Sequence, residues 1–401
     1  MDERDKGLSS KGLPPDGATH AEMLDASPLD VTSPGVDPAG APATGFRGFI
    51  HRHETKLDVA FFIGGFIFDM LLIEAPDHIG GVIQQAVYLV AIAALIHFEM
   101  LYRLRKWRPG KWVKKVWTWR NLALHFFLGT LLNLYSLFYI KSASLFSSLI
   151  FLVLMIGFIL ANELPIVKKA KVSAKVGLYS ICLFSFFSIM FPIAFGFVGW
   201  IPFAFAVAMT LLVFGGQVKL LSRSIVDRML LSRAMLAPVV SVMAAFVVFY
   251  ALGWIPPVPL SVREQGIYHL IEKKGDKVEL SFEKSWWKFW QTSDTDFRAE
   301  VGDKIYFFAQ IYSPTRISDQ VAIHWLQKDA KGNWKSSDRI PMSVHGGRHE
   351  GFRGFAFKGN YTPGEWQVRV ETSSGIEISR LYFDVVSAET TGPRVYTIIE
   401  R

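Results

Sequence analysis

Long apolar runs dominate the chain between residues 57 and 254, and charged residues there fall mostly in short separating segments. A helix needs about 20 predominantly apolar residues to cross the hydrocarbon core of a bilayer. The pattern therefore predicts a membrane α-helical bundle of seven transmembrane helices, at 57–75, 79–101, 121–140, 143–162, 177–197, 200–218 and 236–254. The first run carries Asp69, whose burial at the bilayer centre costs about 3 kcal/mol, but its many Leu, Ile, Val and Phe residues offset that cost.

The pattern changes after Trp254. The segment Ile255–Val262 contains three prolines, which predict a stiff, extended linker. Beyond it apolar and polar residues alternate with the period of a β-strand that has one buried face. A hairpin is expected to turn at Lys274–Asp276, and six more strands are expected at 303–312, 320–328, 339–346, 352–359, 365–372 and 376–386. Eight short strands predict an all-β antiparallel, sandwich-like domain.

The two ends of the chain lack such periodicity. The first 50 residues are rich in Pro, Gly, Ala, Ser and Asp, which predicts a disordered N-terminal tail. The resulting domain plan is a tail, a transmembrane domain, a Pro-rich linker, a β-sandwich domain and a C-terminal tail, at 1–50, 51–254, 255–262, 263–388 and 389–401.

Composition also favours a membrane protein over an ordinary soluble one. The 401 residues are 51% hydrophobic and only 19% charged. The single cysteine, Cys182, excludes an intrachain disulfide and a cysteine-based zinc site.

The distribution of positive charge predicts which side of the membrane each loop occupies. The net charge is +8, and of the seventeen Lys and Arg residues in 57–260, sixteen fall in the loops at 102–120, 168–175 and 219–233, against Lys141 alone in the alternate loops. Short loops with such a bias stay in the cytoplasm. We therefore expect a cytoplasmic N-terminus and a β-rich domain outside the cytoplasm.

The segment Tyr102–Asn121 contains eight basic residues and four tryptophans. Basic residues interleaved with aromatics are typical of nucleic-acid binding, but this segment lies between two predicted spans. Its cations and tryptophans suit the headgroup region of a bilayer with anionic lipid. We expect the lipid bilayer as its partner and no nucleic acid.

The expected outer domain contains a short segment with His345, Arg348, His349 and, slightly further on, Arg353. Two histidines four residues apart share a face only on a helix, and the two intervening glycines favour a turn, so we expect no metal site. The alternatives are a solvated turn, which we favour, and a loop in which the arginines and His349 bind an anionic or sugar ligand.

Trp286 and Trp290 form a second candidate ligand-binding group in this domain. Three interpretations stay open for these tryptophans: packing in the core, insertion into the outer leaflet, or stacking on a sugar ring.

Ionisable residues near span ends are a third group of candidates, because such residues often mark functional sites. His97, Glu99, His125 and Glu163 all lie near the expected cytoplasmic ends of spans. They could share one depth as a substrate or proton site. The simpler interpretation, which we favour, is that they extend toward the headgroups.

Several outer-domain segments resemble a known bacterial family: "GIYHLIEKKG", "AQIYSPTRISDQVAIHWLQKD" and "SVHGGRHEGFRGFAFKGNYTPGEWQVRVETSSG". This family joins a multi-span membrane half to a C-terminal domain of unknown function, number twenty-nine fourteen. The resemblance implies a bacterial envelope protein whose outer domain is periplasmic. It implies no activity.

Together these features predict an inner-membrane protein that displays a periplasmic β-sandwich for ligand binding or envelope assembly, with a polysaccharide or protein of the envelope as a partner. We expect no catalytic residues and no cofactor, because no catalytic signature occurs in its required structural context. The alternative is a transporter or lipid-modifying enzyme that uses the polar residues near the cytoplasmic span ends.

Overall fold

The computed structural model describes residues 76–117, 119–163, 172–275, 277–283, 290–314, 318–345, 351–388 and 394–401. The expected N-terminal tail and the first expected span, 57–75, lie outside the described residues.

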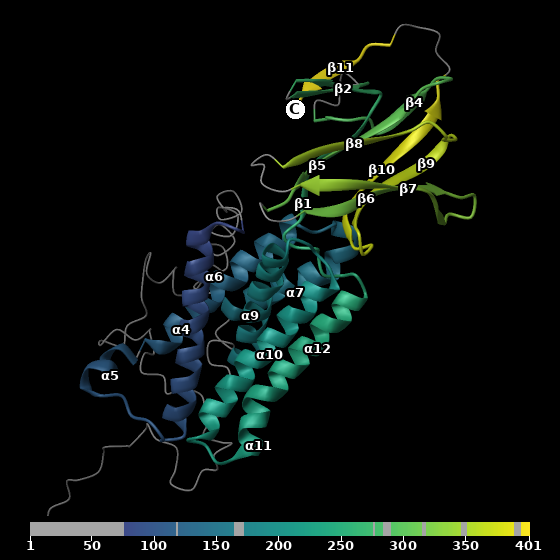
Figure 1. The fold of residues 1–401 in the computed structure, drawn as a ribbon. Coiled ribbons are helices and arrows are strands. Elements are labelled where there is room, and N and C mark those ends of the chain that lie inside the picture. The colour runs from purple at the N-terminus through teal and green to yellow at the C-terminus, as the bar shows by residue number, and fades with distance from the viewer. Residues whose placement is uncertain are drawn as a thin grey trace, which may run out of the picture.

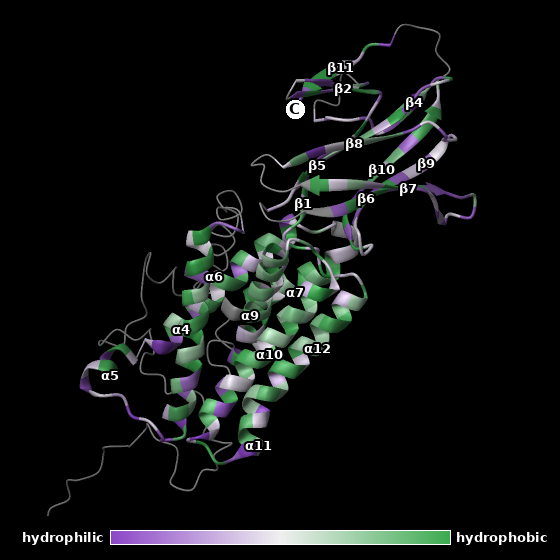
Figure 2. Ribbon diagram, viewed as in Figure 1, coloured by the Kyte–Doolittle hydropathy of each residue, from purple (hydrophilic) through white to green (hydrophobic). Residues whose placement is uncertain are grey.

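Apolar helices form the first half of the described chain (Figure 1). They are α4 (Ile79–Arg103), α5 (Lys111–Trp117), α6 (Arg120–Lys141), α7 (Leu145–Glu163), α9 (Val172–Phe195), α10 (Trp200–Ser222), α11 (Arg228–Leu231) and α12 (Ala237–Ala251), the last two joined by a π-helical turn at Ser232–Leu236. Figure 2 shows that the long helices consist largely of hydrophobic residues.

Five of these helices are long and apolar enough to cross a membrane: α4, α6, α9, α10 and the continuous helix Arg228–Ala251. The expected span 143–162 corresponds to α7, whose apolar stretch Ser147–Leu160 is shorter. The last span begins at Arg228, about two turns before the expected 236, because the π-helical turn Ser232–Leu236 joins α11 to α12 in one continuous helix. The described chain thus supports five of the seven predicted spans at full length.

The helices alternate in direction, so their connections gather at two opposite ends. At one end, the Tyr312 hydroxyl donates to Asp77 Oδ1 (3.4 Å) just before α4, and the Ser144 hydroxyl donates to Glu377 just before α7. Val198, between α9 and α10, packs among buried residues of the β-rich region. The strands therefore lie against one end of the bundle (Figure 1). The opposite end carries basic residues such as Arg103 and Lys219.

Eleven strands follow in the described chain. They are β1 (Ser261–Tyr268), β2 (Leu270–Lys274), β3 (Lys277–Phe282), β4 (Asp296–Ala299), β5 (Ile305–Tyr312), β6 (Ser318–Lys328), β7 (Trp334–His345), β8 (Phe352–Lys358), β9 (Gly364–Thr372), β10 (Glu377–Ser387) and β11 (Thr397–Glu400). They form three sheets, with strand orders β1-β5-β8, β4-β10-β9-β6-β7 and β11-β3-β2.

The three-stranded sheet β1-β5-β8 and the five-stranded sheet bury their inner side chains in one cluster. Phe307 from the first sheet and Trp325, Trp366 and Val368 from the second are among its members. Each large apolar side chain buried in this way stabilises the fold by about 1.5 to 3 kcal/mol. On β10, Phe383 is buried whereas its neighbour Asp384 is exposed, so the opposite face of the five-stranded sheet is left for polar residues.

Most of the strand predictions are confirmed. Strands β2 and β3 form the expected antiparallel hairpin, in which Gly275 has a φ of +63°, and the six further predicted strands correspond to β5 through β10. The expectation of a purely antiparallel arrangement is wrong, because β4, a four-residue strand that the sequence pattern missed, pairs in parallel with β10.

The segment 389–401, expected as a C-terminal tail, also needs correction. Residues Thr397–Glu400 form β11, which pairs with β3 in an antiparallel register. The backbone amide of Arg401 donates to the Val278 carbonyl (2.9 Å), and its guanidinium donates to both carboxylate oxygens of Glu264 (2.6 and 2.7 Å). Four residues are too few to show a β-strand period, which is why the pattern gave no signal here.

Deletion of residues 397–401 should leave β3 as an unprotected edge strand. We expect the free energy for opening β3 to fall by about 2 to 4 kcal/mol, because several backbone hydrogen bonds of about 1 kcal/mol each are lost. Hydrogen exchange of the β3 amides, measured on the full-length protein and the deletion variant in detergent, provides the test. R401Q, which keeps the strand, is the control. Unchanged exchange in the deletion variant would contradict the pairing.

Candidate functional site

The outer face of the five-stranded sheet carries a row of polar residues that runs across neighbouring strands. Asp384 on β10 is the register partner of Asp296 on β4 and of Glu365 on β9. Lys328 on β6 continues the row, because its Nζ donates to Glu365 Oε2 (2.7 Å), and Trp334 on β7 is its register partner. Asp296, Asp384 and Glu365 are called the acidic row below.

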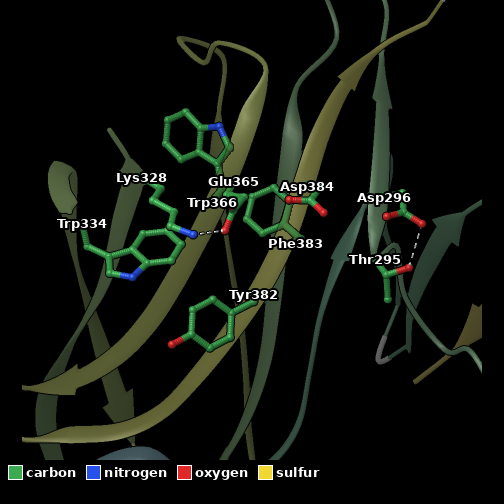
Figure 3. Close-up of a pocket in the computed structure, with 9 residues that line it drawn as sticks. All are labelled: Thr295, Asp296, Lys328, Trp334, Glu365, Trp366, Tyr382, Phe383 and Asp384. Atoms are coloured by element: carbon green, nitrogen blue, oxygen red, sulfur yellow. Dashed lines mark hydrogen bonds and ion pairs between the residues drawn. The ribbon is translucent and has the colours of Figure 1, made fainter. Parts of the chain in front are cut away.

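The acidic row borders a groove of about 550 Å³. Figure 3 shows Trp334 of β7 and Tyr382 and Asp384 of β10 among the side chains that line it. The rings of Trp334 and Tyr382 lie 5.5 Å apart between centroids with an angle of 50° between their planes. The groove therefore joins an aromatic wall on one side to carboxylates on the other.

The electrostatics of the groove are dominated by these carboxylates. Three acidic side chains face one ammonium group, which gives a formal charge of −2. Partial burial raises the pKa of Asp384 above its usual range, and the neighbouring charges of Glu365 and Asp296 raise it further. Among the described residues no cluster of His, Cys, Asp or Glu has an arrangement that could hold a metal ion. The groove is thus suited to hydrogen-bond donors of a ligand.

A hydrogen-bonded chain of side chains lies on the same sheet. His324 Nδ1 is 2.9 Å from Glu371 Oε1, and His324 Nε2 is 2.8 Å from Ser336 Oγ. Arg339 Nε lies 3.3 Å from the other oxygen of Glu371. The order resembles the nucleophile, base and acid of acyl-transfer enzymes. Ser336, however, is exposed to solvent on an edge strand, whereas such chemistry needs an enclosed site, so we assign it no catalytic role.

The outer-domain residues singled out from the sequence lie elsewhere or outside the description. Arg353 is on β8, in the other sheet, opposite Gln310. Trp290 precedes β4, is 61% exposed and does not line the groove. Trp286, Arg348 and His349 lie outside the described residues, as does the side chain of His345. Their proposed ligand-binding role stays a prediction.

One of the four intramembrane candidates, Glu99, belongs to a buried ionic cluster at the basic end of the bundle. Lys175 Nζ donates to both carboxylate oxygens of Glu99 (3.0 and 3.1 Å) and to Asn121 Oδ1 (3.1 Å). Arg103 donates to Glu99 Oε1 through Nε (3.1 Å) and Nη2 (2.7 Å). The exposed fraction is 1% for Glu99 and 0% for Lys175. The cluster ties α4, α6 and α9 together.

Of the other three intramembrane candidates, the structure describes two side chains. The His97 ring packs edge-on against Phe98 (5.6 Å between centroids), and His125 is buried. The side chain of Glu163 lies outside the described residues.

Sequence reasoning missed Lys175 because this residue was counted with a basic loop, although α9 begins at Val172 and places Lys175 in its first turn.

The two partners of the buried ion pair should respond unequally to substitution. In E99Q, Lys175 loses the carboxylate charge that compensates its ammonium group, so we expect a loss of about 3 to 5 kcal/mol in the free energy of unfolding. In K175M, Glu99 keeps Arg103, and the loss should be smaller, about 1 to 3 kcal/mol. The double variant should be more stable than E99Q. Unfolding titrations of the purified protein in mixed detergent micelles measure all three, and equal losses in the two single variants would contradict the assignment.

Comparison with known proteins gives a family match for one segment of the chain and no function. Residues 318–385 match a family described as a protein of unknown function, DUF2914. No curated protein matches the chain. Similar solved structures include an immunoglobulin-like protein from Pseudomonas aeruginosa (11% identity, 32% of this chain and 98% of that chain, TM-score 0.20). They also include a β-glucosidase from Listeria innocua in complex with glucose (13% identity, 23% of this chain and 15% of that chain, TM-score 0.18). At such TM-scores neither supports a conclusion. The matched segment begins with β6 and ends within β10.

Proposed function

We propose that this chain is an integral protein of the bacterial inner membrane whose periplasmic, sandwich-like β domain binds a saccharide in the groove. The groove is the observation that carries this proposal. Its volume of about 550 Å³ falls within the range of small-ligand sites. An aromatic wall suits the C–H faces of a sugar ring, and carboxylates suit its hydroxyl groups as hydrogen-bond acceptors.

A saccharide fits the groove better than an organic cation does. A negatively charged groove with aromatic walls could also attract an amine. Lys328 Nζ, however, already lies 5.9 Å from the centroid of the Trp334 ring and is bonded to Glu365. The lysine thus takes the position that a ligand cation would need, whereas Asp384 and Tyr382 face the groove with groups that can bond neutral hydroxyls.

The orientation and the seven spans are parts of the same proposal. The strands contact one end of the bundle, and the basic segments between α4 and α6 and between α10 and α12 lie at the other. This separation supports cytoplasmic basic loops and a periplasmic domain. Because α4 begins at the strand end, a span at 57–75 would start on the cytoplasmic side, and α7 would complete seven.

The lipid bilayer is the second partner that we propose, through the segment around α5. Trp112 is 91% exposed, and Val116 is exposed beside Lys114 and Lys115. Apolar and basic side chains on one short helix suit the headgroup region of anionic lipid.

Saccharide binding can be tested on the full-length protein in nanodiscs with soluble peptidoglycan fragments and envelope polysaccharides as probes. We expect W334A to weaken binding about tenfold through loss of stacking, and D384N to weaken it through loss of an acceptor. W290A removes an exposed tryptophan outside the groove and is the matched control. Failure of every probe to bind the wild type, or equal losses in W334A and W290A, would contradict the proposal.

The pH dependence gives a separate check. A hydroxyl donor needs an ionised Asp384, and the raised pKa of this carboxyl means that it protonates earlier than an ordinary aspartate as pH falls. Affinity should therefore decline on acidification from a higher pH than usual, and D384N should flatten this decline. Titration calorimetry at several pH values measures it.

The orientation should be visible by protease protection. In intact spheroplasts that express the full chain, we expect external protease to cut the β domain while a cytoplasmic marker stays intact. Protection of the β domain until lysis would overturn the orientation.

A further inference from the structure

One side of α4 is exposed in the described structure. The helix packs against α6, α9 and α10, and Figure 1 shows it along one edge of the bundle. On its other side Ile83, Val87, Val90 and Ala94 are exposed. These residues follow one another at spacings of four, three and four, so they form a single line along the helix. We call this line the α4 stripe.

A polar pair interrupts this apolar surface. Gln84 is exposed beside the α4 stripe, and its Nε2 donates to the Tyr88 hydroxyl one turn further on (3.0 Å). Among the described residues, the hydroxyl hydrogen of Tyr88 has no acceptor in return. Lipid tails offer no acceptor to an exposed O–H or N–H group. The pair therefore calls for an acceptor on a neighbouring segment.

The chain that precedes α4 supplies such a segment. The expected span 57–75 lies outside the described residues and ends next to Pro76. Only residues 76–78 separate it from α4, and the Tyr312 hydroxyl donates to Asp77 within this connection. Two helices joined by so short a connection lie side by side in opposite directions. A span at 57–75 would therefore lie beside α4.

The acidic residue inside this span lies at the level of the polar pair. Asp69 is six residues before Ala75, and Gln84 is five residues after Ile79, so both are about one and a half turns from the connection. An ionised carboxylate only accepts hydrogen bonds, whereas Gln84 and Tyr88 offer N–H and O–H donors. The two surfaces are thus complementary at the same depth.

We propose that the α4 stripe is the docking surface of segment 57–75, with the Asp69 carboxylate accepting hydrogen bonds from the pair Gln84 and Tyr88. This inference rests on the proposed topology, in which 57–75 is a span. It gives Asp69 donors at bilayer depth, where an unpaired carboxylate is unfavourable. A segment tied to α4 by three residues also has a far higher effective concentration at the stripe than a second copy of the chain.

The test is disulfide formation in native membranes that contain the full-length chain. The native Cys182 is first replaced in C182A, so that only introduced thiols remain. The reporter variant is F66C/V87C. Phe66 is three residues before Asp69, and Val87 is three residues after Gln84, so in the proposed docking they face each other one turn from the polar pair.

The matched control is F66C/V153C. Val153 is the ninth residue of α7, as Val87 is the ninth residue of α4, and the two are similarly exposed (61% and 58%). The control thiol therefore lies at a similar depth on a helix that the proposal does not involve.

After oxidation, a thiol-reactive mass tag counts the free cysteines of the denatured chain. F66C/V87C should lose both thiols to an intrachain disulfide, which needs Cα atoms within about 7 Å, and F66C/V153C should keep both. Adding D69L or Q84L to the reporter variant should slow the reaction. Free thiols throughout in F66C/V87C would overturn the docking, as would a disulfide between two chains in V87C alone, which assigns the stripe to a second copy. Unchanged rates with D69L and Q84L would overturn the role of Asp69.

A further variant separates failure of the docking from failure of the proposed topology. Lys56 precedes the expected span, so a membrane-impermeant maleimide should not label K56C in intact spheroplasts. Labelling would overturn the span at 57–75 and the docking with it. Protection of K56C together with free thiols in F66C/V87C would overturn the docking alone.

Discussion

The buried ion pair between Glu99 and Lys175 is the constraint on which the helical half depends. Both side chains are removed from solvent, and the loss of hydration is large enough that such a pair adds little net stability. The pair instead fixes the position of α4 along α9. A shift of α4 against α9 by one turn would separate Lys175 from the Glu99 carboxylate and leave a buried ammonium group uncompensated, while Glu99 would keep Arg103 of its own helix. Alternative packings of these apolar helices are therefore disfavoured.

Three contacts fix the position of the strands relative to this bundle. Val198 packs into the core of the β-rich region, and the Ser144 and Tyr312 hydroxyls bond Glu377 and Asp77 across the boundary. These contacts come from three separate helix connections, so the strands cannot rotate about a single linker. The groove on the outer face of the five-stranded sheet is therefore held at a defined orientation to the helices rather than on a free tether.

The sequence predicted the helices and strands well and the residues of the groove poorly. The physical reason is that helices and strands depend on neighbouring residues, whereas a site depends on residues that are distant in the chain. Hydropathy and the two-residue period are local signals, so they located the long helices α4, α6, α7, α9, α10 and α12 and most strands, but not the short helices α5 and α11. Strands β4 and β11 are too short for a period. The acidic row depends on the register of β4, β10 and β9, and no local sequence pattern contains that register. The sequence pattern instead indicated the charged segment around Arg348 and His349. Glu99 was recognised because it is isolated among apolar residues, but its partner lies on a distant helix.

The strand order also has a consequence for biosynthesis. Among the described strands, β4 pairs with β10, and β3 pairs with β2 on one side and with β11 (Thr397–Glu400) on the other. Neither pairing can form until nearly all of the β-rich region has left the ribosome, because long-range partners must both be present. On the proposed topology, the region would have to pass through the translocation channel as an incomplete chain and close its sheets only on the far side.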